Sequence, residues 1–554
     1  MRVKNILRSI IIVSLFSLAC NLGLNNDKRP ASNAVVINVT AHTGLTSWLE
    51  SAMTNFNQAG LKTTNDKPVY AMLNSVEAGQ VVANISGGAQ PPDMWIPDRE
   101  VWANVLADRG QASFQSNCLS LAESPLVIAM WRPIAEALGW PGRSLGWLDI
   151  GSLAADPSAW AYYSGGQFGP TLRLGHTHPG LSDTGASTLL SIVQAAESKL
   201  EAVTVADIQK PIVQASVGAF EGAVAWFSPS TASLGQTMRQ RGPNFLGAAI
   251  VYENIVVTYG SAGNDRNLDI IPIYPFEGTL MATNPACINT ATAAETQEAA
   301  SLFRDYLLQA EAQQLALANG LRPVNDQVPP GPPLDAAHGV DLSQPERVFG
   351  APGVETLYAV QEVWQAARKD VNLALLLDIS GSMEGDKMEN MRRAAIQFVE
   401  QMGQDDRLTL IAFSTQPTAY AQHVQVGSTR AEIIKTISSL QAGGDTALYD
   451  AIGLSSQIIA MNTSSQTSNA LIVLTDGVDT SSSEFSFDQR LIAAATANNT
   501  IVFAIAYGDD ADKEILGNLA QQANGNFYLG NEANIGAIYE EMSAAFGGSV
   551  GIGR

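Results

Sequence analysis

Three segments of the sequence place oxygen-bearing side chains at the end of an apolar strand or at the start of a helix. LALLLDISGSM runs from an apolar strand into Asp378, Ser380 and Ser382. GGDTALYDA brings Thr446 to the start of a helix, and ALIVLTDG ends a second apolar strand at Asp476. Because ligands in open α/β sheets bind outside the carboxyl ends of the strands, we expect these side chains to meet at one edge of a sheet.

Hydroxyl and carboxylate oxygens in this combination favour a magnesium site. Mg²⁺ is a small, hard cation that takes oxygen ligands in octahedral geometry and keeps some of its waters. Two carboxylates roughly neutralise the ion, which then retains an open position for a carboxylate from another protein. The alternative is that Asp and Ser at these positions are ordinary helix N-caps, but their recurrence in three segments favours the metal. We therefore predict Mg²⁺, or another divalent cation such as Mn²⁺.

The three segments resemble the metal-ion-dependent adhesion site of von Willebrand factor A domains. In that family a D-x-S-x-S motif, a threonine and an aspartate come from three loops at the carboxyl edge of a parallel sheet. All five positions are filled in this chain. The resemblance implies a doubly wound, Rossmann-like domain over residues 371–547, and a protein partner that supplies an Asp or Glu to the metal.

Apolar strands in the C-terminal part of the chain agree with such a fold. Residues 373–377, 408–412, 471–474 and 501–506 are hydrophobic on both faces. Strands of this kind are buried on both faces, as in a parallel sheet that lies between helices. We expect residues 548–554 to form a frayed tail.

Residues 35–326 alternate short apolar strands with helical stretches, which is typical of an α/β domain with a parallel sheet. Several phrases in this part resemble the extracellular solute-binding proteins of ABC transporters, specifically their molybdate- and sulfate-binding-like class. These phrases are PPDMWIPDREVW, LAESPLVIAMWRPIAEALGW, HPGLSDTGASTLL, VYENIVVTYG and IYPFEGT. The resemblance implies a two-lobed, type II periplasmic-binding-protein-like fold, a small-molecule solute in the cleft and an ABC permease as a partner.

A cleft of this class can bind an anion with the free N–H groups of helix N-termini. By the same resemblance, Thr43, Ser75 and Thr184 lie in the loops that would contact the ligand. Each of the three is equally well explained as an ordinary helix cap. The tryptophans of this half suggest core and interlobe packing, with an indole-lined site for a sugar or another organic ligand as the alternative.

The N-terminus predicts export from the cytoplasm. Basic residues precede an apolar run too short to cross a bilayer, which indicates a secretory signal over residues 1–19. The sequence SLAC resembles the lipobox of bacterial lipoproteins. That resemblance implies lipidation of Cys20, a tether over residues 20–34 and anchoring to the cell membrane on its extracytoplasmic side. Plain secretion is the alternative.

Cys118 and Cys287 are the cysteines that remain after Cys20. In an oxidising compartment they can form a disulfide, and two free buried thiols are the alternative. Residues 327–370 are rich in proline at first and then take on helical periodicity, which predicts a linker or a wrapping strap followed by a connecting helix. The joint to the next strand is short, so we expect the two halves to be held in a fixed relation.

Charge and motifs exclude several classes of function. The net charge of −22 argues against a nucleic-acid partner, since phosphate binding needs a basic surface. The sequence has no P-loop, no H-E-x-x-H and no dinucleotide fingerprint, and its five histidines are scattered, so we predict no enzymatic activity. The prediction is a cell-surface lipoprotein that joins a solute-binding domain to a Mg²⁺-dependent protein-binding domain. The alternative is an adhesion or sensor scaffold whose solute-binding fold no longer binds a transported ligand.

Overall fold

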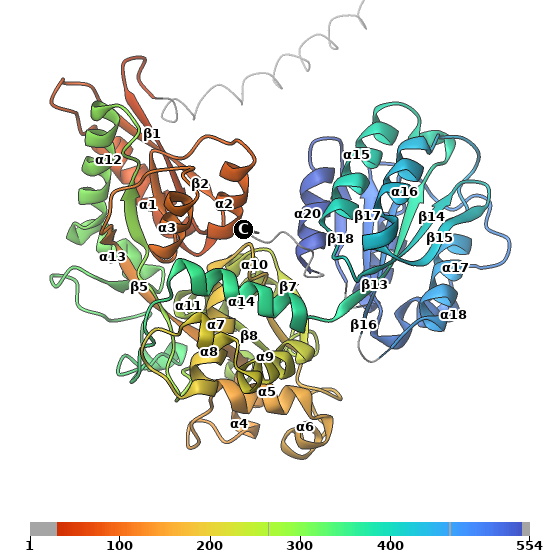
Figure 1. Ribbon diagram of the computed structural model, residues 1–554, viewed down its shortest axis with the longest axis horizontal. Helices are drawn as coiled ribbons and strands as arrows, with labels where there is room; N and C mark the ends of the chain where they lie inside the picture. The colour runs from red at the N-terminus through yellow and green to blue at the C-terminus, as the bar shows by residue number, and fades with distance from the viewer. Residues whose placement is uncertain (1–29, 264, 465–466, 524, 546–554) are drawn as a thin grey trace, which may run out of the picture.

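The computed structural model describes residues 30–263, 265–464, 467–523 and 525–545 (Figure 1). The predicted signal segment 1–19, the predicted lipidation site Cys20 and the predicted tail 548–554 lie outside the described residues. The described chain forms a two-lobed N-terminal half and a C-terminal α/β domain (Figure 1).

Lobe 1 is built on a sheet with the strand order β2-β1-β3-β11-β4. Its strands are β1 (Val35–Ala41), β2 (Val69–Ser75), β3 (Met94–Ile96), β4 (Leu119–Ser120) and β11 (Pro285–Ile288). Its helices are η1 (Thr43–Leu45), α1 (Thr46–Ala59), α2 (Ala78–Ser86), α3 (Val101–Asp108), α12 (Ala294–Leu307) and α13 (Ala310–Ala318). A hydrophobic core of its own lies between β1 and helices α1, α12 and α13.

Lobe 2 has the strand order β10-β5-β8-β6-β7, and β9 and β12 also pair with β5. Its strands are β5 (Ala122–Trp131), β6 (Leu174–Thr177), β7 (Val224–Ser228), β8 (Ala248–Tyr252), β9 (Ile270–Ile273), β10 (Met281–Ala282) and β12 (Arg322–Pro323). Its helices are α4 (Arg132–Ala137), α5 (Trp147–Ala155), α6 (Pro157–Ser164), α7 (Asp183–Glu197), α8 (Val205–Ile208), α9 (Pro211–Ala223), α10 (Thr231–Arg241), α11 (Glu253–Gly260) and η2 (Arg266–Leu268).

This half has the predicted α/β fold, but its sheets are mixed, with antiparallel pairs beside the expected parallel ones. Strands β1, β2 and β3 are parallel, as are β6, β7 and β8, but β11 is antiparallel to β3, and β5 is antiparallel to β8 and β9. The reason is that the chain crosses between the lobes at Leu121, before β5, and again at Asn284, before β11. The Leu121 amide donates to the Asn284 carbonyl at 3.2 Å, so the two crossings lie side by side.

The proline-rich segment wraps lobe 2. Around η3 (Ala336–His338), Leu334, Val340 and Phe349 are buried, and the Phe349 amide donates to the Thr279 carbonyl at 2.8 Å. The connecting helix α14 (Val354–Ala367) follows and packs on α7, α8 and α9 (Figure 1). The sequence allowed either a linker or a wrapping strap here, and in the structure the segment is a strap.

The C-terminal domain has the strand order β15-β14-β13-β16-β17-β18. Its strands are β13 (Asp370–Asp378), β14 (Arg407–Phe413), β15 (Pro417–Gln425), β16 (Thr467–Thr475), β17 (Ile501–Tyr507) and β18 (Phe527–Gly530). Its helices are η4 (Gly381–Met383), α15 (Asp386–Gln401), α16 (Val426–Ser439), α17 (Leu448–Met461), α18 (Gln489–Thr496), η5 (Ala497–Asn499), α19 (Lys513–Gln522) and α20 (Ile535–Ala545). The structure confirms the four predicted apolar strands, which are β13, β14, β16 and β17.

Strand β15 is an exception to the predicted parallel sheet, because it is antiparallel to β14. It lies at the edge of the sheet, where its residues alternate between intermediate and exposed positions. Such a strand has no continuous apolar run, so the sequence pattern gave no sign of it.

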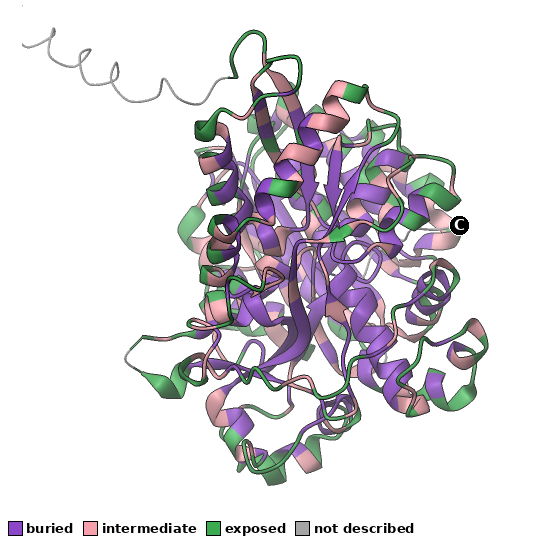
Figure 2. Ribbon diagram, turned by 90° about the vertical axis from the view of Figure 1, so that its left-hand side faces the viewer, coloured by how far each residue is buried: buried purple, intermediate pink, exposed green. Residues whose placement is uncertain are grey.

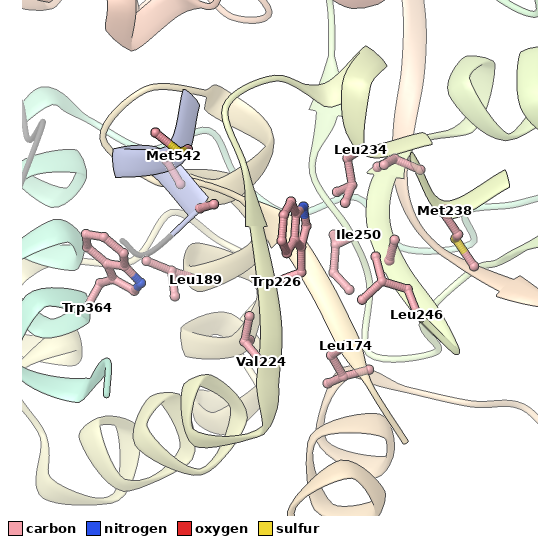
Figure 3. Close-up of a cluster of buried hydrophobic side chains, with 14 of the residues drawn as sticks. Leu174, Leu189, Val224, Trp226, Leu234, Met238, Leu246, Ile250, Trp364 and Met542 are labelled. Carbon is pink, nitrogen blue, oxygen red and sulfur yellow. The ribbon is translucent and has the colours of Figure 1, made fainter. Parts of the chain in front are cut away.

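Buried residues line the strands and the inward faces of the helices (Figure 2). Lobe 2 and the C-terminal domain share one continuous core. The indole of Trp226 on β7 stacks on the ring of Phe503 on β17, with centroids 5.8 Å apart. Met542 of α20 and Trp364 of α14 belong to the same buried cluster (Figure 3). The side chain of Arg241 also donates to Asn526 Oδ1 at 3.0 Å. These non-covalent contacts hold the two halves together in addition to the covalent connection between them.

Candidate functional site

The five side chains predicted to hold a metal come together at the carboxyl edge of the C-terminal sheet. Strand β13 ends at Asp378, and β16 ends one residue before Asp476. Ser380 and Ser382 follow β13 in the turn that includes η4. Thr446 precedes α17, and its loop is joined to the β13 turn because the Gly381 amide donates to the Gly444 carbonyl at 3.0 Å.

Short oxygen-to-oxygen distances connect these residues. Ser382 Oγ donates to Asp476 Oδ1 at 2.6 Å and lies 3.1 Å from Ser380 Oγ. Thr446 Oγ1 and Ser382 Oγ both lie within 4 Å of the point where Gly477 would carry a Cβ atom. The three hydroxyls and the Asp476 carboxylate therefore face one small volume.

The electrostatics of this volume favour a cation. The side chains of Asp378 and Asp476 are fully buried. Burial raises the pKa of Asp378, and the negative charge of Asp476 raises it further, while hydrogen bonds from Thr475 and Ser380 lower it. Two buried carboxylates close together repel each other, so positive charge between them is stabilising.

Lys387 supplies a positive charge to the site, and the sequence patterns did not single it out. Its Nζ lies 2.5 Å from Asp476 Oδ2, the carboxylate oxygen that Ser382 does not contact. Lys387 stands in the first turn of α15, where the helix dipole disfavours a cation. No local signal in the sequence could have identified it, because Asp476 lies 89 positions further along the chain.

Further residues outside the predicted set fix the loops. Thr475 Oγ1 donates to Asp378 Oδ2 at 2.5 Å. The Thr446 amide donates to Thr480 Oγ1 at 2.9 Å, and the carboxylate of Asp450 accepts from the amides of residues 483–485. The donors are all oxygen, which fits Mg²⁺ or Mn²⁺ better than a softer metal. Among the described residues no group of three or more His, Cys, Asp or Glu is arranged to hold a metal, so the hydroxyls are essential to this assignment.

The residues predicted for the solute cleft lie at the facing ends of the two lobes. Thr43 belongs to η1 of lobe 1, and its hydroxyl donates to Glu77 Oε1 at 2.5 Å. Ser75 ends β2 and accepts from Thr46 Oγ1 at 2.9 Å. Thr184 is buried in the first turn of α7 in lobe 2, 3.4 Å from Ser182 Oγ. Glu77 and Ser182 are the residues here that the sequence patterns missed.

Both halves match known families. The family model described as bacterial extracellular solute-binding protein matches residues 37–322. The chain belongs to this family. The von Willebrand factor type A model matches residues 372–541, so the chain joins a solute-binding domain to a von Willebrand factor A domain. Both are domains of binding type.

Relatives cover one domain or the other. Uncharacterized protein sll0103 of Synechocystis is 31% identical over 168 residues, which are 30% of this chain and 39% of that protein. Mouse inter-alpha-trypsin inhibitor heavy chain H3 is 26% identical over 31% of this chain and 21% of its own length. The chain thus spans well under half of these relatives. The structure of the sulfate-binding protein SubI from Mycobacterium tuberculosis is 16% identical, with a TM-score of 0.39 over 58% of this chain and 96% of SubI.

The described part of the solute-binding protein contains no helix that is both long enough and apolar enough to span a bilayer. Its Cys118 and Cys287 form a disulfide that joins the segment before β4 to β11. The disulfide is one of the two alternatives that the sequence left open, the other being two free thiols.

Replacing Lys387 by Met should tighten metal binding to the von Willebrand factor A domain. A divalent cation that binds Asp476 must displace the Lys387 ammonium, and the Met variant removes this competitor while keeping the length of the side chain. We expect the Kd for Mn²⁺, measured by titration calorimetry, to fall about tenfold or more, which corresponds to about 1.4 kcal/mol. Lys435→Met, at an exposed position on α16, is the matched control and should leave the Kd unchanged. Unchanged or weaker binding in Lys387→Met would show that the two cations do not compete.

Asp98 is a buried carboxylate that follows β3 in lobe 1. Its Oδ1 lies 3.5 Å from His42 Nδ1, and neither carboxylate oxygen has a hydrogen-bond partner among the described residues. The pKa of Asp98 is raised to about 7, mainly by burial, while His42 lowers it and the charges of Asp183 and Glu77 raise it. The folded protein therefore keeps a proton on Asp98 over a pH range in which the unfolded chain has released it.

The stability of the protein should consequently fall as the pH rises from about 4 to about 7, and Asp98→Asn should remove part of this fall. Three units of pKa correspond to roughly 4 kcal/mol, which is the upper bound of the effect. Thermal unfolding of the wild type and the variant at pH 5 and pH 8 measures the difference. The exposed Asp66→Asn is the control. An equal loss of Tm in wild type and Asp98→Asn would show that Asp98 is ionised throughout this range.

Proposed function

We propose that this protein is an extracytoplasmic, membrane-anchored lipoprotein whose von Willebrand factor A domain binds a partner protein through a divalent cation. The observation that carries the proposal is the convergence of Asp378, Ser380, Ser382, Thr446 and Asp476 on one volume, where buried carboxylates lack full neutralisation. These residues would hold Mg²⁺ or Mn²⁺. The role is binding and not catalysis, in keeping with the type of both domains.

The bound ion would offer a position to an oxygen ligand from outside the chain. Ser382 is exposed at the surface, whereas Asp378 and Ser380 are buried beneath it. An incoming Asp or Glu would therefore approach from the side on which Ser382 is exposed. A carboxylate is a fitting ligand because Mg²⁺ and Mn²⁺ prefer hard oxygen donors, and the hydroxyls of the site are neutral ligands that add no negative charge of their own.

An extracytoplasmic location is supported by two observations. The solute-binding family to which the chain belongs is extracellular by description. The disulfide between Cys118 and Cys287 is of a kind that persists in oxidising compartments and is rare in the cytosol. Lipidation of Cys20 would place the domain at the membrane surface. Replacing Cys20 by Ala should release the protein from membranes into the soluble fraction.

The partner-binding claim is tested by crosslinking on intact cells that display the full chain. A photoreactive amino acid placed at Glu384, an exposed residue beside Ser382, would mark whatever protein docks at the metal. We expect crosslinked product in Mg²⁺ buffer and its loss both in EDTA and in Asp378→Ala. Crosslinking that survives EDTA and the substitution would refute a metal-dependent interaction.

A second function is favoured by the direct contact between the two lobes at the cleft. The protein would act as an adhesion or sensor scaffold in which the solute-binding fold does not carry a transported ligand. The supporting observation is the direct backbone contact between the lobes, where the Gln80 amide of α2 donates to the Leu181 carbonyl at 3.1 Å. An ABC permease would then not be a partner. Thermal-shift measurements against oxyanions, sugars and amino acids distinguish the two functions, because a bound ligand raises the Tm.

A further inference from the structure

Glu77 occupies the place in the cleft where donors from both lobes converge. It lies just before α2 in lobe 1, and its side chain is almost fully buried, with 3% exposure. Oε1 accepts from the Thr43 hydroxyl of the same lobe at 2.5 Å and from the Thr231 amide of lobe 2 at 3.1 Å. Oε2 accepts from the Ser182 hydroxyl of lobe 2 at 2.7 Å.

These donors form the kind of set that binds an anion. Thr231 is the first residue of α10, and Ser182 immediately precedes α7, so the positive ends of two long helices lie next to the carboxylate. Thr231 Oγ1 is itself buried and has no hydrogen-bond partner among the described residues. The Ala232 amide donates to Thr43 Oγ1 at 3.3 Å, which ties the hydroxyl donor of lobe 1 to the same helix.

Other contacts close the lobes on both sides of this carboxylate. A Cβ atom on Gly79 would lie 2.2 Å from the Gly180 carbonyl oxygen and 2.8 Å from that of Leu181, so the lobes are in backbone contact next to Glu77. On the other side, the Asn254 side chain of lobe 2 donates to the Gly44 carbonyl of lobe 1 at 2.8 Å.

We infer that Glu77 is a built-in anion of the cleft: its carboxylate occupies the donor set that a free oxyanion would use and latches the two lobes together. The residue therefore determines specificity, because it excludes sulfate, phosphate and related oxyanions from the native protein. Removal of the carboxylate should convert the cleft into an oxyanion site that closes only when the ion is supplied. The inference concerns the solute-binding domain alone and does not rest on the proposed metal site.

The test compares full-length wild type, Glu77→Ala and Glu77→Gln by thermal unfolding and by small-angle X-ray scattering, with and without sulfate. The wild type should keep its Tm and radius of gyration in sulfate. Glu77→Ala should have a lower Tm and a larger radius, and sulfate should restore both, the Tm by several degrees. Glu77→Gln fills the volume without the charge, so it should have a lower Tm and no response to sulfate. Glu50→Ala, at an exposed position on α1, controls for loss of one negative charge.

Three outcomes would overturn the inference. A sulfate-dependent rise of the wild-type Tm equal to that of Glu77→Ala would mean that the carboxylate does not occupy the anion position. A Glu77→Ala protein as stable and as compact as wild type would mean that it is no latch. If Glu77→Ala fails to fold, Glu77→Gln decides alone, and an unchanged Tm in that variant would show that the charge contributes nothing.

Discussion

Asp378→Ala should abolish Mn²⁺ binding in a protein that remains folded. Asp378 stands at the end of the central strand β13 and is one of two carboxylates in the site, so its removal halves the negative charge that holds the cation. Loss of a residue that only hydrogen-bonds to a metal ligand lowers metal affinity about 10-fold to 100-fold. We therefore expect loss of a direct ligand to lower the affinity by more than about 100-fold. Titration calorimetry with Mn²⁺ on the full chain measures the effect without knowledge of the partner.

The fold should survive because two effects oppose each other. The substitution leaves Thr475 Oγ1 and the Ser380 amide without their acceptor, at a cost of about 1–3 kcal/mol each. It also removes a carboxylate that burial and the Asp476 charge destabilise. Asp509→Ala is the matched control, since Asp509 lies at the same edge of the sheet after β17 and its side chain is fully exposed. Equal Mn²⁺ affinity in Asp378→Ala and Asp509→Ala would exclude the proposed metal site.

Breaking the disulfide between Cys118 and Cys287 should lower the stability of the solute-binding domain by about 2–5 kcal/mol. The bond joins residues 169 positions apart, and cross-links that close long loops restrict the unfolded chain most. It fastens the segment before β4 to β11, which runs from the second crossing between the lobes. We expect the Cys118→Ala, Cys287→Ala double variant to unfold at a clearly lower temperature in a calorimetric scan.

Reducing agent provides the control for this second result. It should lower the Tm of the wild type toward that of the double variant and leave the double variant unchanged. Cys287 is fully buried, so the Ala substitution also removes some packing. The reduced wild type keeps both cysteine side chains, so its Tm shows the effect of losing the cross-link without the loss of packing. If reduction leaves the wild-type Tm unaltered, the bond does not stabilise the domain.

The candidate metal site in the C-terminal half was predictable because each of its signals is local. An apolar run that ends in Asp378 predicts a buried parallel strand with an acidic end, and this prediction needs no information from other parts of the chain. The order of the three motifs and the rule that parallel strands present their carboxyl ends at one edge then brought Thr446 and Asp476 to the same place. Strands without a continuous apolar run, such as β15, could not be predicted in this way. An edge strand buries few of its side chains, so its sequence need not be apolar.

The sequence by itself determined the fold class of both halves and the identity of the oxygen donors at the C-terminal edge. Only the tertiary structure decided which charges meet. Lys387 reaches Asp476 across 89 positions, and Glu77 meets Thr231 across 154. Neither pair has a spacing or a periodicity that a linear pattern can register. Such contacts depend on how sheets, lobes and loops are packed in space, and it is this packing that sets the charge at both sites.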